Sequence, residues 1–313
     1  MLSRVANSIY WMSRYIERAE NIARFISVNV HLMLDMALDP DNTQWRPLVT
    51  TTGDESDFTK RYREATEKNV IQFLTFDSQN VNSILSCIQF ARENARTVRE
   101  IISSEMWEQI NELYHFVQGQ SRKRRLADPQ AFYAHIRLAS HLITGLCENT
   151  MSHGEGWHFA QVGKMLERAD KTARILDVKY FLLLPTLEYF DSPYDAVQWG
   201  AVLKSANAFE MYRKHYHRIH YKEVTEFLIF DREFPRSIAY CVQAAADSLM
   251  AICKDHSGAI AARTEMQKIQ KSLLSTNVDA VLANGLHEFI DILQFNLNIV
   301  DRAIHQSFFD LAA

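Results

Sequence analysis

The sequence contains an internal repeat, and this repeat constrains the fold more than any other feature. Residues 16–28 match residues 166–178 at 6 of 13 positions, where two unrelated segments would agree at about one. A second block, Phe-Leu-x-Phe-Asp, occurs at 73–77 and again at 227–231. The two blocks keep their order along the chain. We therefore predict a tandem duplication of one structural unit.

The repeat divides the 313 residues into two parts of similar length. Residues 1–153 are predicted to form the first helical repeat and residues 154–313 the second. Each part is long enough to form an ordinary domain. We expect the two repeats to associate as one compact double unit with pseudo-twofold symmetry.

Apolar and small residues recur with the period of an α-helix. Near the N-terminus they fall at positions 9, 12, 16, 19, 23, 26, 30 and 34, which places them on one helix face. Only 9 glycines and 6 prolines are present, which favours long helices with short connections. No stretch shows sustained alternation of apolar and polar residues. The predicted fold class is therefore all-α, with a helical bundle in each repeat.

Helix boundaries are predicted from the same pattern and from the prolines. The first helix is expected to end at Pro40, and its counterpart over 157–184 at Pro185. The Phe-Leu-x-Phe-Asp blocks are expected at helix ends, with Asp77 or Asn80 capping the next helix and Pro235 in a first turn. Further helices are predicted at 82–102, 131–151, 236–254 and 279–310.

Charge and hydropathy exclude several classes of function. With 34 basic and 38 acidic residues the net charge is -4, so no general attraction to nucleic acid or to an anionic membrane is expected. The one basic run, 122–125, is interpreted as a solvated loop. The longest apolar stretch, 180–187, is too short to span a membrane, and residues 1–11 do not resemble a signal peptide. We expect a cytoplasmic protein.

Cysteine and histidine spacing does not indicate a metal centre or a redox pair. The four cysteines lack C-x-x-C spacing and are interpreted as small buried apolar side chains: Cys87, Cys147, Cys241 and Cys253. Two E-x-x-H spacings match the pattern of di-iron bundles, where chance alone predicts about one: Glu112–His115 and Glu155–His158. No glycine pattern of a nucleotide-binding or hydrolase fold occurs. We predict neither a metal nor a cofactor.

The first repeated block carries charged residues at helical spacing. Glu17, Glu20 and Arg24 lie on one helix face, and Glu20 precedes Arg24 by four residues, the favoured orientation for an ion pair. We expect the two copies of this helix to pack across the pseudo-twofold axis and to form a half-buried charged network. The counterparts in the second copy are Glu167, Asp170 and Arg174.

Two interpretations of this network stay open. Buried ion pairs often fix helix register without catalysing anything, which would make the network architectural. Paired carboxylates and arginine forks also bind peptides, amino acids or phosphate, which would make it a ligand site. The architectural interpretation is preferred because ion-pair networks outnumber active sites.

A basic stripe distinguishes the first repeat from the second. Arg92, Arg96 and Arg99 share one face of a predicted helix, whereas the second copy carries uncharged residues there, namely Ala246, Met250 and Cys253. An anion-binding face on the first repeat is one interpretation. A solvated helix face is the other.

Three stretches together resemble the bacterial alpha-E domain proteins. They are LSRVANSIYWMSRYIERAEN at 2–21, FARENARTVR at 90–99 and LERADKTARILDVKY at 166–180. Val81 departs from the family, which tends to have proline there. The resemblance implies an all-helical protein encoded beside a circularly permuted ATP-grasp protein and a transglutaminase-like protein, and a role in making or modifying peptides through amide bonds.

The resemblance also shapes the functional hypotheses. We expect an accessory protein that binds the ATP-grasp ligase or presents its peptide substrate. The alternatives are an enzyme of that pathway, with Glu17 or Glu167 as general base, and a structural assembly protein. A peptide or amino acid is the expected ligand, and the candidate binding residues are Arg14, Arg18, Glu20, Arg24, Arg92, Arg96, Arg99, Arg168, Asp170 and Arg174.

Overall fold

Two long helices, α1 (Ser3–Met36) and α8 (Glu155–Leu183), carry the repeated charged segment. The structure is a computed structural model, and it describes residues 1–36, 45–123, 126–183, 193–253 and 259–310. These residues include no β-strand, so the predicted all-α class is confirmed. The chain divides into two compact units, Met1–Lys164 and Met165–Ala313. The predicted repeat boundary, after residue 153, lies just before α8.

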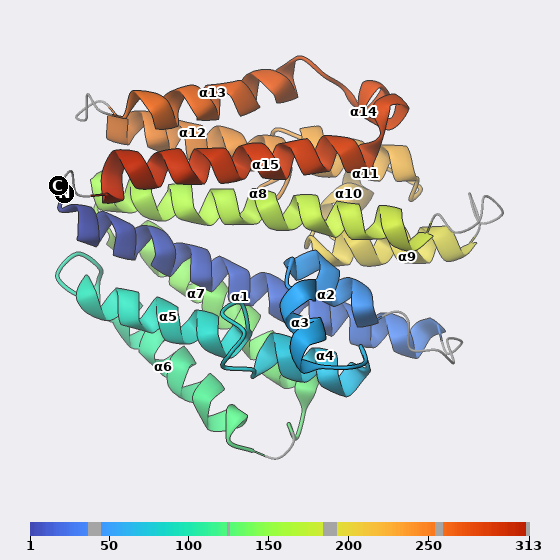
Figure 1. Ribbon diagram of the computed structural model, residues 1–313, viewed down its shortest axis with the longest axis horizontal. Helices are drawn as coiled ribbons and strands as arrows, with labels where there is room; N and C mark the ends of the chain where they lie inside the picture. The colour runs from blue at the N-terminus through green and yellow to red at the C-terminus, as the bar shows by residue number, and fades with distance from the viewer. Residues whose placement is uncertain (37–44, 124–125, 184–192, 254–258, 311–313) are drawn as a thin grey trace. The chain divides into compact units, whose positions relative to one another are not determined.

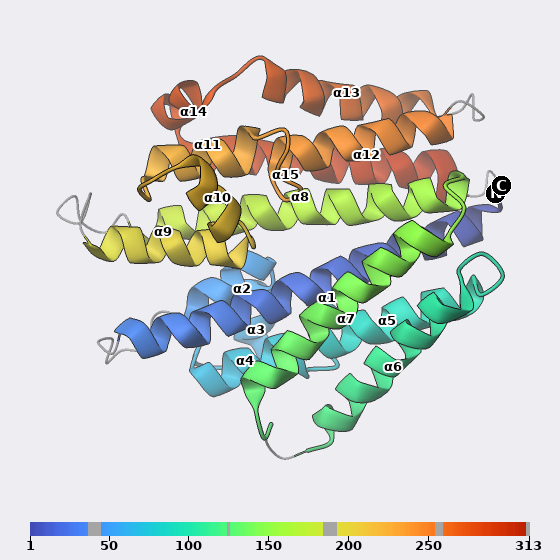
Figure 2. The same ribbon diagram turned by 180° about the vertical axis from the view of Figure 1, so that it is seen from behind.

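Unit 1 (Met1–Lys164) is organised around α1. This helix packs against α5 (Ile84–Thr97) and α7 (Pro129–Thr150), and α6 (Ser104–Ser121) packs against both of them (Figures 1 and 2). The predicted apolar face of α1 is buried, as Ile9, Ile16 and Ala23 show. Three short helices contact one another or α1: α2 (Arg46–Thr52), α3 (Glu55–Arg61) and α4 (Glu67–Thr75).

Unit 2 (Met165–Ala313) contains most of α8 and a further set of helices. Here α13 (Ile260–Leu274) packs against α12 (Ile238–Cys253) and α15 (Leu286–Ile304), as Figure 2 shows. Four shorter helices complete the unit: α9 (Pro193–Ser205), α10 (Phe209–His215), α11 (Tyr221–Phe230) and α14 (Val278–Asn284). A π-helical turn over His305–Phe309 follows α15.

Matching sequence positions adopt the same local packing in the two units. Phe58 stacks on Tyr62 with ring centroids 5.1 Å apart, and Tyr212 stacks on Tyr216 at 4.8 Å. Phe58 also contacts Phe73 edge-on, and Tyr212 contacts Phe227 edge-on. Phe73 and Phe227 are the first residues of the two Phe-Leu-x-Phe-Asp blocks. These aromatic clusters have equivalent geometry, while the duplication itself stays a prediction from sequence.

The Phe-Leu-x-Phe-Asp blocks lie at the ends of α4 and α11, as predicted, but the predicted caps are wrong. Ser83 caps α5 by accepting a hydrogen bond from the amide of Ser86. Asp77 and Asn80 instead accept hydrogen bonds from amides two residues ahead, so they shape the loop and do not cap the helix. Pro235 precedes α12 and does not lie in its first turn.

Two predicted helices are shorter than expected. The helix predicted over 279–310 is interrupted at Gly285, whose φ of 102° is incompatible with an α-helix, so α14 and α15 are separate. The helix predicted over 82–102 ends at Thr97. Pro40 and Pro185, where the two longest helices were expected to end, lie outside the described residues.

The cysteine prediction is confirmed for three of the four side chains. Cys87, Cys147 and Cys241 are buried, and burial raises the pKa of Cys147 to about 11. Cys253 is only partly buried. None of the described helices combines the length and apolar character that a membrane crossing requires.

Gly163 generates the first testable prediction. A Cβ atom at this position of α8 would lie 2.4 Å from the backbone oxygen of Tyr10 on α1, so the helix backbones approach too closely for any side chain. We expect Gly163→Ala to lower the free energy of unfolding by about 1–3 kcal/mol, because one of the helices must move. Urea denaturation measures the change.

Gly145→Ala is the matched control, since Gly145 lies inside α7 and an added Cβ would meet nothing within 4 Å. This change should raise the free energy of unfolding by about 0.5–1 kcal/mol through higher helix propensity. Equal effects of the two substitutions would contradict the close approach of α1 and α8 at Gly163.

Candidate functional site

Glu17, Glu20 and Arg24, charged residues of the repeated segment in unit 1, are buried, and each has a partner on its own helix. Glu20 and Arg24 form an ion pair in which both side chains are almost fully buried. Asn21 donates a hydrogen bond to Oε1 of Glu17 at 3.1 Å. His141 of α7 places Nε2 3.5 Å from Oε1 of Glu20. The predicted Glu20–Arg24 pair is therefore present, and a ring from a neighbouring helix approaches it.

Arg18 and Arg14, on the same helix, contact different parts of unit 1. Arg18 donates a hydrogen bond to Oδ1 of Asn82 at 2.6 Å, in the loop before α5. Asn82 in turn donates to Oδ1 of Asp54 at 2.7 Å, so Arg18 links α1 to two other segments of unit 1. Arg14 donates to the hydroxyl of Tyr10 at 2.9 Å and lies 4.9 Å from the Trp11 ring.

The motif in unit 2 repeats this pattern with changed partners. Arg174 donates from Nε to Oδ2 of Asp170 at 2.9 Å. Lys171 lies 3.5 Å from Oε1 of Glu167, whose side chain is fully buried. Arg168 donates to the carbonyl oxygen of Pro235 at 3.1 Å, in the loop before α12. Arg18 and Arg168 thus each reach the loop that precedes the next long helix of their own unit.

Electrostatics keeps the partly buried carboxylate of Asp170 ionised. Burial alone would raise its pKa, but the cations of Lys171 and Arg174 outweigh this effect and hold the pKa below its ordinary value. An ionised carboxylate with neighbouring cations is what an architectural ion pair requires. The predicted packing of the Glu17 helix against the Glu167 helix stays a prediction.

The three arginines of the predicted basic stripe do not share one helix in unit 1. Arg92 and Arg96 lie on α5, but α5 ends at Thr97, so Arg99 lies in the turn that follows and the predicted common helix face is wrong for it. Arg92 is partly buried between helices, because it donates from Nε to Oδ1 of Asn111 at 2.7 Å and lies 4.7 Å from the Tyr114 ring. Arg96 is exposed and pairs with Glu93 at 2.7 Å. Arg99 is exposed as well. Arg92 therefore joins α5 to α6, while the other two arginines face an open surface.

A groove of about 960 Å³ opens beside Arg96 and Arg99. It is lined by the start of α1, the end of α5 and the first turn of α6, where Trp107 lies 4.9 Å below the guanidinium of Arg99. Arg4 and Arg99 make no hydrogen bond or ion pair with any residue that the structure describes. We name this the arginine groove, and its charged lining residues are Arg4, Arg96, Arg99, Glu100 and Glu108.

Sequence reasoning had singled out two residues of the arginine groove, Arg96 and Arg99, but not Arg4 or Trp107. The spacing of Arg96 and Arg99 marked them as one helix face. Arg4 and Trp107 belong to other helices, and only the packing of α1 and α6 beside α5 brings them to the same place.

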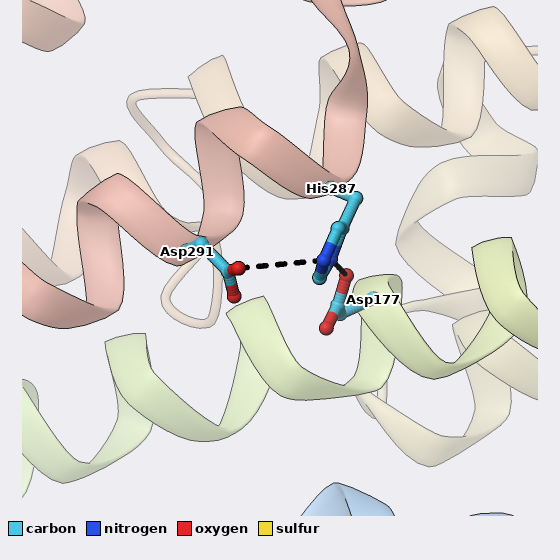
Figure 3. Close-up of side chains that lie close together, drawn as sticks. All are labelled: Asp177, His287 and Asp291. Atoms are coloured by element: carbon cyan, nitrogen blue, oxygen red, sulfur yellow. Dashed lines mark hydrogen bonds and ion pairs between the residues drawn. The ribbon is translucent and has the colours of Figure 1, made fainter.

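Unit 2 contains a second polar cluster that sequence reasoning missed. Figure 3 shows the His287 ring of α15 between two carboxylates, those of Asp177 on α8 and Asp291 on α15. Burial would lower the pKa of His287, but hydrogen bonding to Asp177 and the charge of both aspartates raise it. The E-x-x-H residues form no comparable group among the described residues. Asp177 and His287 are 110 residues apart, so no motif could reveal them.

Comparison with known families decides the classification. A family model described as a predicted α-helical domain with a conserved ER motif, named Alpha-E, matches residues 1–309. The chain belongs to the alpha-E family. The Glu-Arg pairs at 17–18 and 167–168 are its two examples of that dipeptide in the repeated segment.

Relatives of this alpha-E protein are uncharacterised proteins of Mycobacterium bovis and Mycobacterium tuberculosis. Each is 26% identical over 257 residues, which cover 76% of this chain and 28% of the relative. The chain therefore spans only about a quarter of the length of the curated relatives it matches. No solved structure matches it.

The Glu20–Arg24 pair generates the second prediction for this alpha-E protein. Glu20→Gln removes the carboxylate next to a buried guanidinium, so we expect the free energy of unfolding to fall by about 3–5 kcal/mol. The control is Asp57→Asn, which breaks the exposed Asp57–Lys60 pair and should cost at most about 1 kcal/mol. Urea denaturation compares them, and equal midpoints would argue against an architectural role.

Proposed function

We propose that this alpha-E protein is an accessory protein that binds a peptide with an acidic or free carboxylate group and presents it to an amide-bond-forming ATP-grasp partner. The observation that carries the proposal is the arginine groove in unit 1. Two of its guanidinium groups, Arg4 and Arg99, have no carboxylate partner among the described residues and face the same space.

The chemistry of the arginine groove suits a peptide carrying both charges. Guanidinium groups bind carboxylates with two parallel hydrogen bonds, which supports Arg4 and Arg99 as the anion-binding pair. Glu100 and Glu108 in the same lining would pair with an ammonium group. The volume of about 960 Å³ falls at the upper end of the range of about 300–1,000 Å³ typical of ligand pockets.

Two further observations support an accessory role over catalysis. The side chains of Glu17 and Glu167, the candidate general bases, are 5% and 0% exposed. A general base must reach the proton that it removes, and such burial restricts that contact. In the mycobacterial relatives the matched segment is 28% of a longer chain, so there it is joined to other protein segments. The link to an ATP-grasp ligase is supported by the family resemblance.

Peptide binding tests the proposed function of the arginine groove. The probe is the unlabelled tripeptide Glu-Ala-Glu with free termini, and binding is measured by isothermal titration calorimetry at low salt. We expect Arg99→Gln and Arg4→Gln each to weaken binding at least about tenfold, since a charged hydrogen bond contributes about 1.5–3 kcal/mol. The control is Arg46→Gln, whose side chain is exposed and pairs with Glu55 outside the groove. Equal affinity of all variants, or no binding by the wild type, would contradict the assignment.

Complex formation tests the proposed partner. We expect the tagged alpha-E protein, co-produced with the circularly permuted ATP-grasp protein of the same organism, to retain that protein through affinity purification and gel filtration. Failure to recover a complex in repeated preparations would remove the accessory role. The arginine-groove variants should keep the complex and lose only the peptide.

The enzyme alternative makes an opposite prediction in the same system. If Glu17 were a general base, Glu17→Gln would leave the melting temperature nearly unchanged while product formation collapsed. For an accessory protein the variant loses output only in proportion to the folded protein that it loses.

A further inference from the structure

The cluster in unit 2 has the geometry of a metal site. Nδ1 of His287 lies 2.7 Å from Oδ1 of Asp177, and Nε2 of the same ring lies 3.3 Å from Oδ2 of Asp291. We propose that His287 and Asp291 bind a divalent transition-metal ion, with Asp177 as the positioning residue that orients the imidazole (Figure 3). The proposal is independent of the arginine groove, which lies in unit 1.

The spacing of the two donor atoms fits a shared ion. Two bonds of about 2.1 Å that meet at a tetrahedral angle place their ligand atoms about 3.4 Å apart. The distance from Nε2 to Oδ2 is 3.3 Å. His287 and Asp291 are four residues apart on α15, so one helix face presents both donors without any rearrangement.

The contact with Asp177 favours Nε2 of His287, and not Nδ1, as the metal-binding nitrogen of the ring. In the neutral tautomer that carries its proton on Nδ1, His287 donates that proton to the Asp177 carboxylate, and the lone pair of Nε2 is directed toward Asp291. Two electron-rich atoms then face each other, and a cation between them relieves the repulsion. Metal-ligating histidines commonly donate their other N–H to a carboxylate in this way.

The structure does not require charged residues at this place. In unit 1 the second residue of α7, Gln130, accepts a hydrogen bond from Ser27 of α1 at 2.8 Å. In unit 2 the second residue of α15, His287, makes the corresponding contact to Asp177 of α8. The amide nitrogen of Gln130 also lies 3.1 Å from Nδ1 of His31 on α1. Helices can therefore be joined here without a carboxylate, and Asp291 adds a second carboxylate that this contact does not need.

The donor set and its exposure indicate the class of ion. One imidazole nitrogen with a carboxylate oxygen suits Zn²⁺, Mn²⁺ or Fe²⁺ better than it suits Ca²⁺ and Mg²⁺, because those two ions prefer oxygen ligands alone. The Asp291 side chain is 61% exposed, so an ion can enter from solvent and the remaining coordination positions can hold water or a ligand. Glu288, next to His287, adds negative charge that favours a cation.

Metal titration of the purified 313-residue chain tests the proposal. After EDTA treatment and dialysis, ZnCl₂ binding is measured by isothermal titration calorimetry, and Co²⁺ binding by its visible absorption. We expect a Zn²⁺ site in the wild type that is at least tenfold weaker in Asp291→Asn and in His287→Gln. Glutamine stands at the corresponding position in unit 1, so His287→Gln keeps a side chain able to contact Asp177.

Asp247→Asn, which changes an exposed aspartate on α12, is the matched control and should bind Zn²⁺ as the wild type does. A thermal melt of each variant confirms that it is folded. Unchanged Zn²⁺ and Co²⁺ binding in both site variants, or no binding in the wild type, would overturn the proposal. The cluster would then be a protonated imidazole held between two carboxylates.

Discussion

The middle of α1 is buried on nearly every side, and this constrains every charge that it carries. Each residue over 19–27 is buried, including Glu20 and Arg24. An ionised group in such a place is stable only when an opposite charge and hydrogen bonds replace the water that it has lost. The i,i+4 pairing of acid and base on one helix supplies that partner before any other helix packs against it.

The same constraint explains why Arg18 and Arg168, the arginines of the two Glu-Arg dipeptides, have contacts of another kind than Arg24 and Arg174. Arg18 is less buried than Glu20 and Arg24, and Arg168 is less buried than Glu167 and Lys171. Each of these two arginines reaches the loop that precedes the next long helix. Both contacts are to neutral oxygens, those of Asn82 and Pro235. In this chain the repeated charged segment therefore joins each long helix to a loop of its own unit, through a charge pair within the helix and an arginine that reaches outward.

Groups suited to binding lie away from these buried segments, and they differ between the units. Unit 1 has guanidinium groups and Trp107 around an open groove, whereas unit 2 has a histidine between two aspartates. Where unit 1 joins its helices by Ser27, His31 and Gln130, unit 2 uses a carboxylate and a histidine. Two units with equivalent aromatic packing thus carry different exposed groups, guanidinium groups around a groove in unit 1 and a histidine with two aspartates in unit 2.

Helix content, the buried face of α1 and the Glu20–Arg24 pair could be predicted from the sequence, because a helix of regular period places residues three and four apart together. Local loop geometry decided the caps, where Ser83 replaced the predicted Asp77 or Asn80, and the positive φ of Gly285 divided the last predicted helix. Arg4 with Trp107, and Asp177 with His287, depend on which helices pack side by side. Periodicity determines which side of a helix is buried, but contacts between distant segments arise only from tertiary packing, and both candidate sites are made of such contacts.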